Sequence, residues 1–170
     1  MNFVDAENYL LVKQGEGAKE ELFKLAVHFA EKSNTVLYIS SKPLKSLPAV
    51  EIPDRDVLKR IIFMYFEQIH QLTGKLLELH SFSITPKLII MESLHEFKSE
   101  NSDADIDKHS LAISALFNGM QYLRRQLGSG CTSVVSVDSL RSNVNLQTLV
   151  DLYYYKTAIY SLDSIFNKDV

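Results

Sequence analysis

An acidic residue at the end of an apolar run is the clearest candidate for chemistry in this sequence. Leu88–Met91 is a run of four apolar residues, and Glu92 and Ser93 follow it directly. Such a short run is typical of a strand that is buried on both faces in a parallel sheet, and α/β proteins bind ligands where these strands end. A carboxylate there can help to hold Mg²⁺ beside a nucleotide. The simpler interpretation is a core strand that ends in a solvated Glu.

A glycine-containing loop before the first amphipathic segment is a second candidate, because it is a common setting for phosphate binding. The apolar run Tyr9–Val12 leads into the loop Lys13–Lys19, which contains Gly15 and Gly17. From Ala18 to Glu31 the apolar residues then fall at helical spacing, which predicts a helix. The order strand, loop and helix is therefore the one that a phosphate site requires.

The phosphate-binding pattern G-x-x-x-x-G-K-[ST] is incomplete in this loop. With its lysine placed on Lys19, the pattern requires glycine, glycine and a hydroxyl where the chain has Lys13, Ala18 and Glu20. Glycines let backbone N–H groups approach a phosphate without a Cβ in the way, and the hydroxyl would bind Mg²⁺. The charge of Glu20 would also repel phosphate oxygens. We therefore expect no working phosphate site here, with Lys19 as a remnant.

These candidates must be positioned by strands that alternate with helices. The predicted strands are 9–12, 35–40, 60–66, 87–92, 132–137 and 153–162, and the predicted helices are 18–31, 67–81 and 110–127. We interpret 53–59 as a polar connector that can be helical, and 98–108 as a flexible loop. This alternation predicts a doubly wound, mostly parallel α/β sheet with helices on both faces. The polar strand ends Ser40, Glu92 and Asp138 should then lie along one edge.

Length and composition favour one soluble domain that spans residues 1–170. The chain is 46% hydrophobic and 23% charged with a formal net charge of −3, so any nucleic-acid binding must come from a local basic patch. There is no apolar stretch near the length of a membrane span and no pattern of a secretory signal at the N-terminus. Cys131 is the one cysteine, which excludes an internal disulfide and suits a reducing compartment.

The order of these motifs resembles the RecA-family recombinases and their paralogues from about Tyr9 to about Leu162. The segment 10–30 lies where the family has Walker A and its helix, LIIMES at 88–93 resembles the Walker B strand, and SVVSVDS at 133–139 lies where a strand ends in a phosphate-sensing residue. The most specific likeness is to the SWIM-domain-associated ATPase-like subunit of the Shu complex, through the turn Lys42–Pro48 after the strand 35–40. The resemblance implies a RecA-like P-loop ATPase core, here shortened after its last strand.

The departures from the family pattern point to a degenerate nucleotide site. In this alignment the catalytic Glu falls near Lys42, the Walker B acid is Glu92 where the family typically has Asp, and the sensor Gln is replaced by Asp138 or Ser139. Several parts of a phosphoryl-transfer site are thus missing together. We expect a pseudo-ATPase with no catalytic residue and no cofactor, and with a vestigial nucleotide site at Gly17, Lys19 and Glu92.

Basic and aromatic residues offer two candidate sites for nucleic acid. Lys42, Lys45, Lys98 and Arg141 follow predicted strand ends and could form a basic rim that binds DNA phosphates, although scattered surface charges are as plausible. Tyr153–Tyr155 and Lys156 could stack bases, but tyrosines alternating along a strand are the more common case. The five histidines have no i, i+4 pair and no cysteine partner, so we predict no metal site.

The resemblance implies a nuclear, non-catalytic subunit of a Shu-type complex that promotes homologous recombination and DNA repair. Its partners would be a SWIM-domain protein, other recombinase paralogues and the recombinase filament, with single-stranded or forked DNA bound through the complex and no membrane involved. Two alternatives remain. One is a divergent active ATPase whose site is completed by a neighbouring subunit, and the other is a structural RecA-like subunit of an RNA-modification complex.

Overall fold

Six parallel strands form one sheet in the order β3-β2-β4-β5-β1-β6. The structure is a computed structural model that describes residues 7–13, 17–47, 51–100, 105–128, 130–139 and 146–167. The strands are β1 (Asn8–Lys13), β2 (Val36–Ser40), β3 (Ile61–Tyr65), β4 (Leu88–Met91), β5 (Thr132–Asp138) and β6 (Ala158–Ile159). The predicted strands 35–40, 87–92 and 132–137, whose polar ends should lie along one edge, do lie side by side as β2, β4 and β5.

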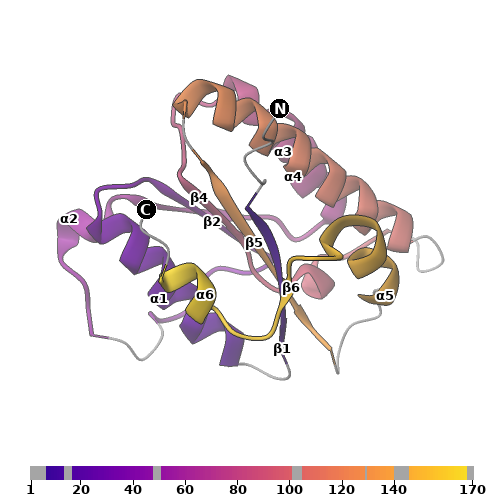
Figure 1. Ribbon diagram of the computed structural model, residues 1–170, viewed down its shortest axis with the longest axis horizontal. Coiled ribbons are helices and arrows are strands. Elements are labelled where there is room, and N and C mark those ends of the chain that lie inside the picture. The colour runs from indigo at the N-terminus through magenta and orange to yellow at the C-terminus, as the bar shows by residue number, and fades with distance from the viewer. Residues whose placement is uncertain are drawn as a thin grey trace.

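Helices cover both faces of the sheet, and Figure 1 shows the two layers. One layer contains α1 (Gly17–Glu31), α2 (Arg55–Leu58) and α6 (Asp163–Phe166). The other contains α3 (Ile69–Leu77), the 3₁₀ turns η1 (Leu79–Ser81) and η2 (Leu94–Glu96), α4 (Asp105–Leu127), α5 (Leu146–Leu149) and the π-helical turn η4 (Val150–Tyr154). The prediction of a doubly wound parallel α/β sheet is therefore confirmed.

The central strands are buried on both faces because their side chains alternate between two cores. In β4, Ile89 and Met91 pack with α3 and α4, whereas Leu88 and Ile90 pack with α1. Every residue of β2, β4 and β5 is buried. This is why β4 is an unbroken apolar run rather than an alternating pattern, and why β2 is apolar up to Ser40.

The prediction of a strand over residues 153–162 is wrong for most of its length. Tyr153 and Tyr154 belong to η4, and only Ala158–Ile159 form a strand, which is at the sheet edge as expected. The helical turn prevails because Leu149, Val150, Tyr153 and Tyr154 fall at spacings of one and four residues, which brings all of them against the core under α4.

The long helix α4 also differs from its prediction at the N-terminal end. It begins at Asp105, inside the segment 98–108 that the sequence predicts as a loop, and residues 101–104 lie outside the described part of the chain. Leu111, near the start of the predicted helix 110–127, is 57% exposed. Gly128 follows the last residue of the helix, with a φ of +60° that glycine adopts without strain. None of the helices in the described residues is both long and apolar enough to cross a membrane.

Candidate functional site

The carboxyl ends of β2, β4 and β5 meet at one edge of the sheet, as the sequence predicts. Because β4 lies between β2 and β5 in parallel register, the polar residues Ser40, Glu92 and Asp138 follow one another along this edge. The Glu92 amide continues the ladder and donates a hydrogen bond to the Ile39 carbonyl at 2.8 Å. This edge is where an α/β sheet binds its ligands.

Glu92 is held by two partners in a nearly dry setting. Its side chain is 4% exposed, and the Tyr38 hydroxyl donates a hydrogen bond to Oε2. The Lys19 ammonium lies 3.6 Å from Oε1. Burial, and then the charge of Glu92, raise the pKa of Tyr38, so this phenol stays protonated and remains a donor. Both carboxylate oxygens therefore face groups of the protein itself.

The vestigial site predicted at Gly17, Lys19 and Glu92 is thus brought together in space. Gly17 is the first residue of α1, Lys19 lies in its first turn, and this turn faces the end of β4 through the pair with Glu92. Residues 14–16, which include Gly15, lie outside the described part of the chain. The start of α1 and the end of β4 thus lie next to each other, and the lysine contacts the acid.

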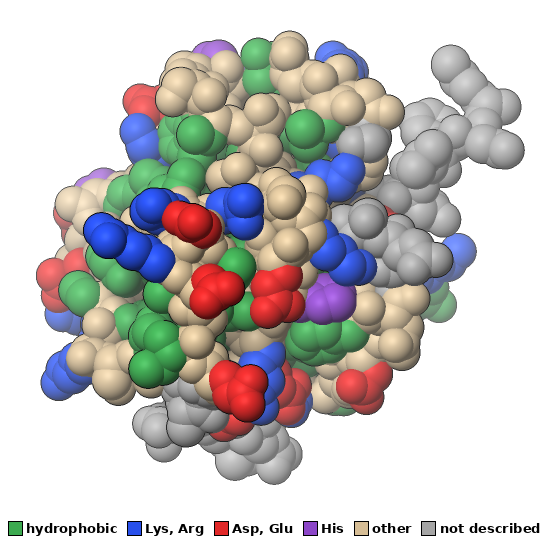
Figure 2. Space-filling view, turned by 90° about the vertical axis from the view of Figure 1, so that its left-hand side faces the viewer, with side chains coloured by type: hydrophobic (Ala, Val, Ile, Leu, Met, Phe, Trp, Pro, Cys, Tyr) green, Lys and Arg blue, Asp and Glu red, His purple; other side chains and the backbone are tan. Residues whose placement is uncertain are grey.

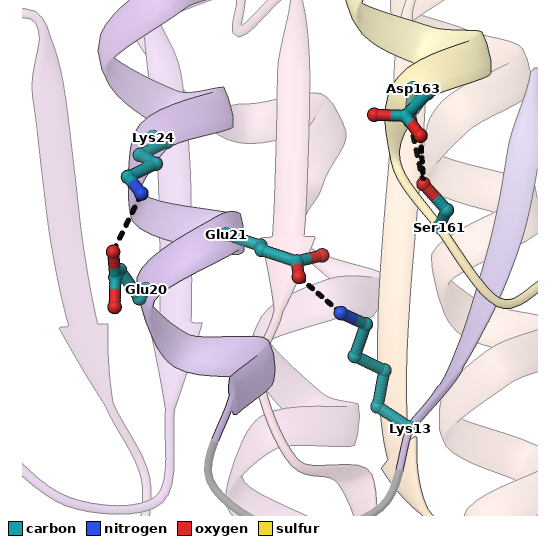
Figure 3. Close-up of polar contacts among 6 residues, drawn as sticks. All are labelled: Lys13, Glu20, Glu21, Lys24, Ser161 and Asp163. Atoms are coloured by element: carbon teal, nitrogen blue, oxygen red, sulfur yellow. Dashed lines mark hydrogen bonds and ion pairs between the residues drawn. The ribbon is translucent and has the colours of Figure 1, made fainter.

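A second ion pair links the end of β1 to the start of α1. Lys13 is bonded to Glu21 across the loop, and Figure 3 shows the two side chains pointing toward each other. Glu20, expected to lie near phosphate oxygens, instead lies on the outer surface of α1 and accepts a hydrogen bond from Lys24 at 2.6 Å. The carboxylate that contacts Lys19 is therefore Glu92, and Glu21 is paired with Lys13.

The turn after β4 folds back over the strand ends. Ser93 has φ 54° and ψ 62°, a left-handed conformation that costs about 1 kcal/mol for a residue other than glycine. The Ser93 amide donates to Ser136 Oγ at 2.8 Å, which satisfies a buried donor next to β5. Backbone strain and a specific hydrogen bond together fix the direction in which η2 leaves the sheet.

Through this turn η2 contacts the ends of the two strands that flank β4. The Asp138 amide donates to His95 Nδ1 at 3.3 Å, and Ser41 donates to Glu96 Oε2 at 3.0 Å. Asp138, one of the two residues at the predicted sensor position, is buried, whereas Ser139 is exposed. The position near Lys42, expected to lack a catalytic base, is an exposed lysine beyond the end of β2.

The four residues predicted to bind DNA are only partly brought together. Lys98 pairs with Glu67, and Lys98 first and then Lys42 lower the pKa of that carboxyl. Two of the lysines therefore share one acidic neighbour at the end of β3. Lys45 is exposed in the loop after β2, and Arg141 lies outside the described residues.

Sequence reasoning missed Tyr38, which bonds Glu92, and Glu21, which pairs with Lys13 at the end of β1. Tyr38 is 54 residues away from Glu92 in the chain, and in β2 it is indistinguishable from an ordinary core aromatic. Only the parallel pairing of β2 with β4 places its hydroxyl beside the acid. In the described part of the chain no three His, Cys, Asp or Glu side chains are grouped so that they could hold a metal ion.

Among the described residues, cavities also lie away from this edge, and two of them bear on function. The first, of about 720 Å³, is lined by α1, residues 51–54 and Phe166. Carboxylates of Glu31, Glu51 and Asp54 line it together with Lys24, and Figure 2, which shows the side of the molecule where α2 lies, displays acidic and basic side chains intermixed. The second, of about 370 Å³, lies between α4 and the segment before β6.

No protein-family model matches the sequence, and no curated protein matches it. Among solved structures, the fold is similar to that of a DnaB-like replicative helicase from a study of its interactions with primase, with 11% sequence identity and a TM-score of 0.44. The match covers 78% of this chain and 39% of the helicase chain, so this chain spans well under half of that protein's length.

Proposed function

We propose that this protein is a RecA-like pseudo-ATPase that works as a non-catalytic subunit of a Shu-type complex in the nucleus. In this role it holds a SWIM-domain protein and other recombinase paralogues, and through the complex it binds single-stranded or forked DNA and supports assembly of the recombinase filament. The resemblance of motif order supports this family, and the site supports the loss of catalysis.

The observation that carries the proposal is the contact of Lys19 with Glu92. In an active site the lysine would bind phosphate oxygens and the acid would help to hold Mg²⁺. Here each is the other's partner, and Tyr38 occupies the second carboxylate oxygen. An incoming triphosphate would have to separate an existing ion pair, and it would find no hydroxyl at residue 20 to complete the metal site.

The test is thermal unfolding of the full chain, alone and in its purified complex, with and without millimolar ATP and Mg²⁺. A ligand that binds only the folded state raises the melting temperature, and the proposal expects no rise. It also expects that Lys19→Ala leaves complex formation and DNA binding nearly unchanged. A tenfold loss of either, or clear stabilisation by ATP, would contradict it.

One observation favours the alternative of an active ATPase completed by a neighbouring subunit. Lys19 is 41% exposed and lies at 3.6 Å from its partner, so its ammonium could turn toward a ligand at small cost. This alternative expects stabilisation by ATP in the complex but not in the isolated chain.

Co-purification with an RNA-modifying partner instead of a SWIM-domain protein would favour the remaining alternative, a structural role outside recombination.

A further inference from the structure

A groove with aromatic and basic walls lies at the opposite end of the strands from the candidate site. Its volume is about 370 Å³, and we name it the aromatic–basic groove after Phe117, Arg124, Tyr155 and Lys156, which line it. Asn8, the first residue of β1, also lines it, which places it at the amino end of the sheet. Figure 1 shows the surrounding elements, with α4 on one side and the yellow segment between α5 and β6 on the other.

The aromatic wall presents apolar surface to solvent. Tyr155 is 77% exposed and Leu152 is 65% exposed, whereas the intervening Tyr154 is fully buried against Phe117. The helical turn η4 thus directs neighbouring tyrosines to different places. Tyr154 anchors the segment in the core, and Tyr155 is exposed beside the groove. Exposed aromatic rings beside a concave surface are typical of binding sites.

The basic wall retains its charge. Arg124 donates one hydrogen bond, to the Cys131 carbonyl at 3.3 Å, which leaves most of its five N–H donors for a ligand. Lys156 is exposed, and in the described residues neither cation lies within 4.0 Å of a carboxylate.

Two carboxylates of the described residues each accept a hydrogen bond from a neighbouring side chain. Glu7, whose charge acts on Arg124, accepts a hydrogen bond from Thr132 at 2.8 Å. Asp151, which precedes Leu152, accepts one from Gln147 at 2.8 Å. None of the residues that line the groove is acidic. The groove therefore combines aromatic side chains with two positively charged ones, and the amide side chains of Asn8 and Gln121 also line it.

We propose that the aromatic–basic groove binds single-stranded nucleic acid, with one base stacked on Tyr155 and the adjacent phosphates beside Lys156 and Arg124. The proposal rests on the proposed function, which gives the complex single-stranded DNA as a ligand, and it places that contact away from the predicted lysine rim. A stacking ring next to cations is the combination that holds single strands without reading their sequence. An acidic peptide would use the cations but would gain little from the aromatic wall.

The experiment measures binding of a fluorescently labelled oligo(dT) to the full chain and to its purified complex. Because stacking of one base contributes about 1–3 kcal/mol, Tyr155→Ala should weaken binding by about 5- to 150-fold. Lys156→Gln should weaken it less and reduce the slope of log K against log salt by about 0.7.

Tyr160→Ala is the matched control, because Tyr160 is 74% exposed but does not line the groove. It should leave binding unchanged. Equal effects of the two tyrosine variants on oligo(dT) binding would overturn the proposal. Polyglutamate serves as a competitor of oligo(dT). If Tyr155→Ala weakens the binding of polyglutamate as much as that of oligo(dT), the proposal is overturned too.

A further variant separates this inference from the proposed function. If Lys42→Gln, Lys45→Gln and Lys98→Gln together abolish oligo(dT) binding and Tyr155→Ala does not change it, the groove is not the DNA site, although the proposed function stands. If neither the chain nor the complex binds oligo(dT), the groove proposal fails, and the identity of the co-purifying partners tests the proposed function independently.

Discussion

Two buried tyrosines differ in what their hydroxyl groups contact, and this difference can be measured. Tyr38 and Tyr154 are both 0% exposed, and each lies in one of the two cores. The hydroxyl of Tyr38 donates to the buried carboxylate of Glu92, whereas within the described residues the hydroxyl of Tyr154 has no hydrogen-bond partner. Removal of these two hydroxyls should therefore have opposite effects.

Tyr38→Phe should lower the free energy of unfolding by about 1.5–3 kcal/mol, because it leaves a buried carboxylate oxygen without its donor. Lys19→Met should lower it by less than about 1 kcal/mol, since the Lys19 side chain is 41% exposed and its pair is long. Urea unfolding followed by circular dichroism measures both. An equal or larger effect of Lys19→Met would show that the ion pair, rather than the phenol, holds Glu92.

Tyr154→Phe should leave stability unchanged or raise it by up to about 1 kcal/mol. The ring keeps its contact with Phe117, and a buried hydroxyl that lacks a partner is removed. The same urea experiment applies, with Tyr38→Phe as the comparison. A loss above about 1 kcal/mol would mean that the hydroxyl is bonded in solution.

At the scale of elements, α4 lies close to η1 only because one of its residues is glycine. A Cβ at Gly119 would lie 2.4 Å from Cδ1 and 3.2 Å from Cβ of Leu79, which is buried. Side chains cannot pack at the shorter distance, so either Leu79 or the whole of η1 would have to move. The contact between α3, η1 and α4 forms one wall of the larger core.

Gly119→Ala should therefore destabilise the protein by about 1–3 kcal/mol, although alanine is the better helix former. Gly74→Ala in α3 is the matched control, because Gly74 is exposed and no atom lies within 4 Å of the added Cβ. This control should stabilise by about 0.5–1 kcal/mol. Thermal unfolding of both variants measures these effects. If both variants are more stable than the wild type, Leu79 and η1 can move away from the added methyl group at little cost.

The elements that the sequence predicts best are those whose own residues determine their structure. The run Leu88–Met91 and the helical spacing within 18–31 each satisfy a local rule, and the structure contains both elements, as β4 and α1. The tyrosines at 153–155 satisfy two rules at once, because β-branched and aromatic composition favours a strand and the spacing from Leu149 favours a helix. Packing under α4 decides in favour of the helical turn, and this packing is not local information.

The candidate site also has a part that the sequence could predict and a part that it could not. Lys19 and Glu92 could be predicted as neighbours because a helix start and a strand end have fixed places in a parallel α/β sheet. Their actual contact could not, because it depends on how a long lysine side chain turns and on the hydroxyl of Tyr38 from another strand. The position of η2 over this edge also depends on the left-handed backbone conformation of Ser93. Glycine is the usual sequence signal for that conformation, and this position is a serine, so the turn could not be predicted.

At the scale of the whole molecule, burial of weak acids makes the fold sensitive to alkali. Burial raises the pKa of the Cys131 thiol to about 12, and it also raises the pKa of Tyr38 and of Tyr154. Cys131 lies just before β5, where its thiol donates to the Pro86 carbonyl at 3.1 Å. These three groups stay protonated in the folded state at pH values where the unfolded chain releases their protons.

The stability that these groups contribute is fully present below their unfolded pKa values, near 9 for the thiol and 10 for the phenols. It is lost as the pH rises above them, because the unfolded state then binds fewer protons than the folded state. The free energy of unfolding should hence fall from about pH 9 upward, by at most about 1.4 kcal/mol per pH unit for each group.

Urea unfolding at a series of pH values between about 7 and 11 measures this fall. Tyr154→Phe is the informative variant, because it removes one of the three groups without removing a hydrogen bond that the described residues show. Above pH 10 its stability should decline less steeply than that of the wild type, by the share of one phenol. The same slope in both proteins would mean that Tyr154 ionises as readily in the folded state as in the unfolded chain, and hence that the core under α4 admits water.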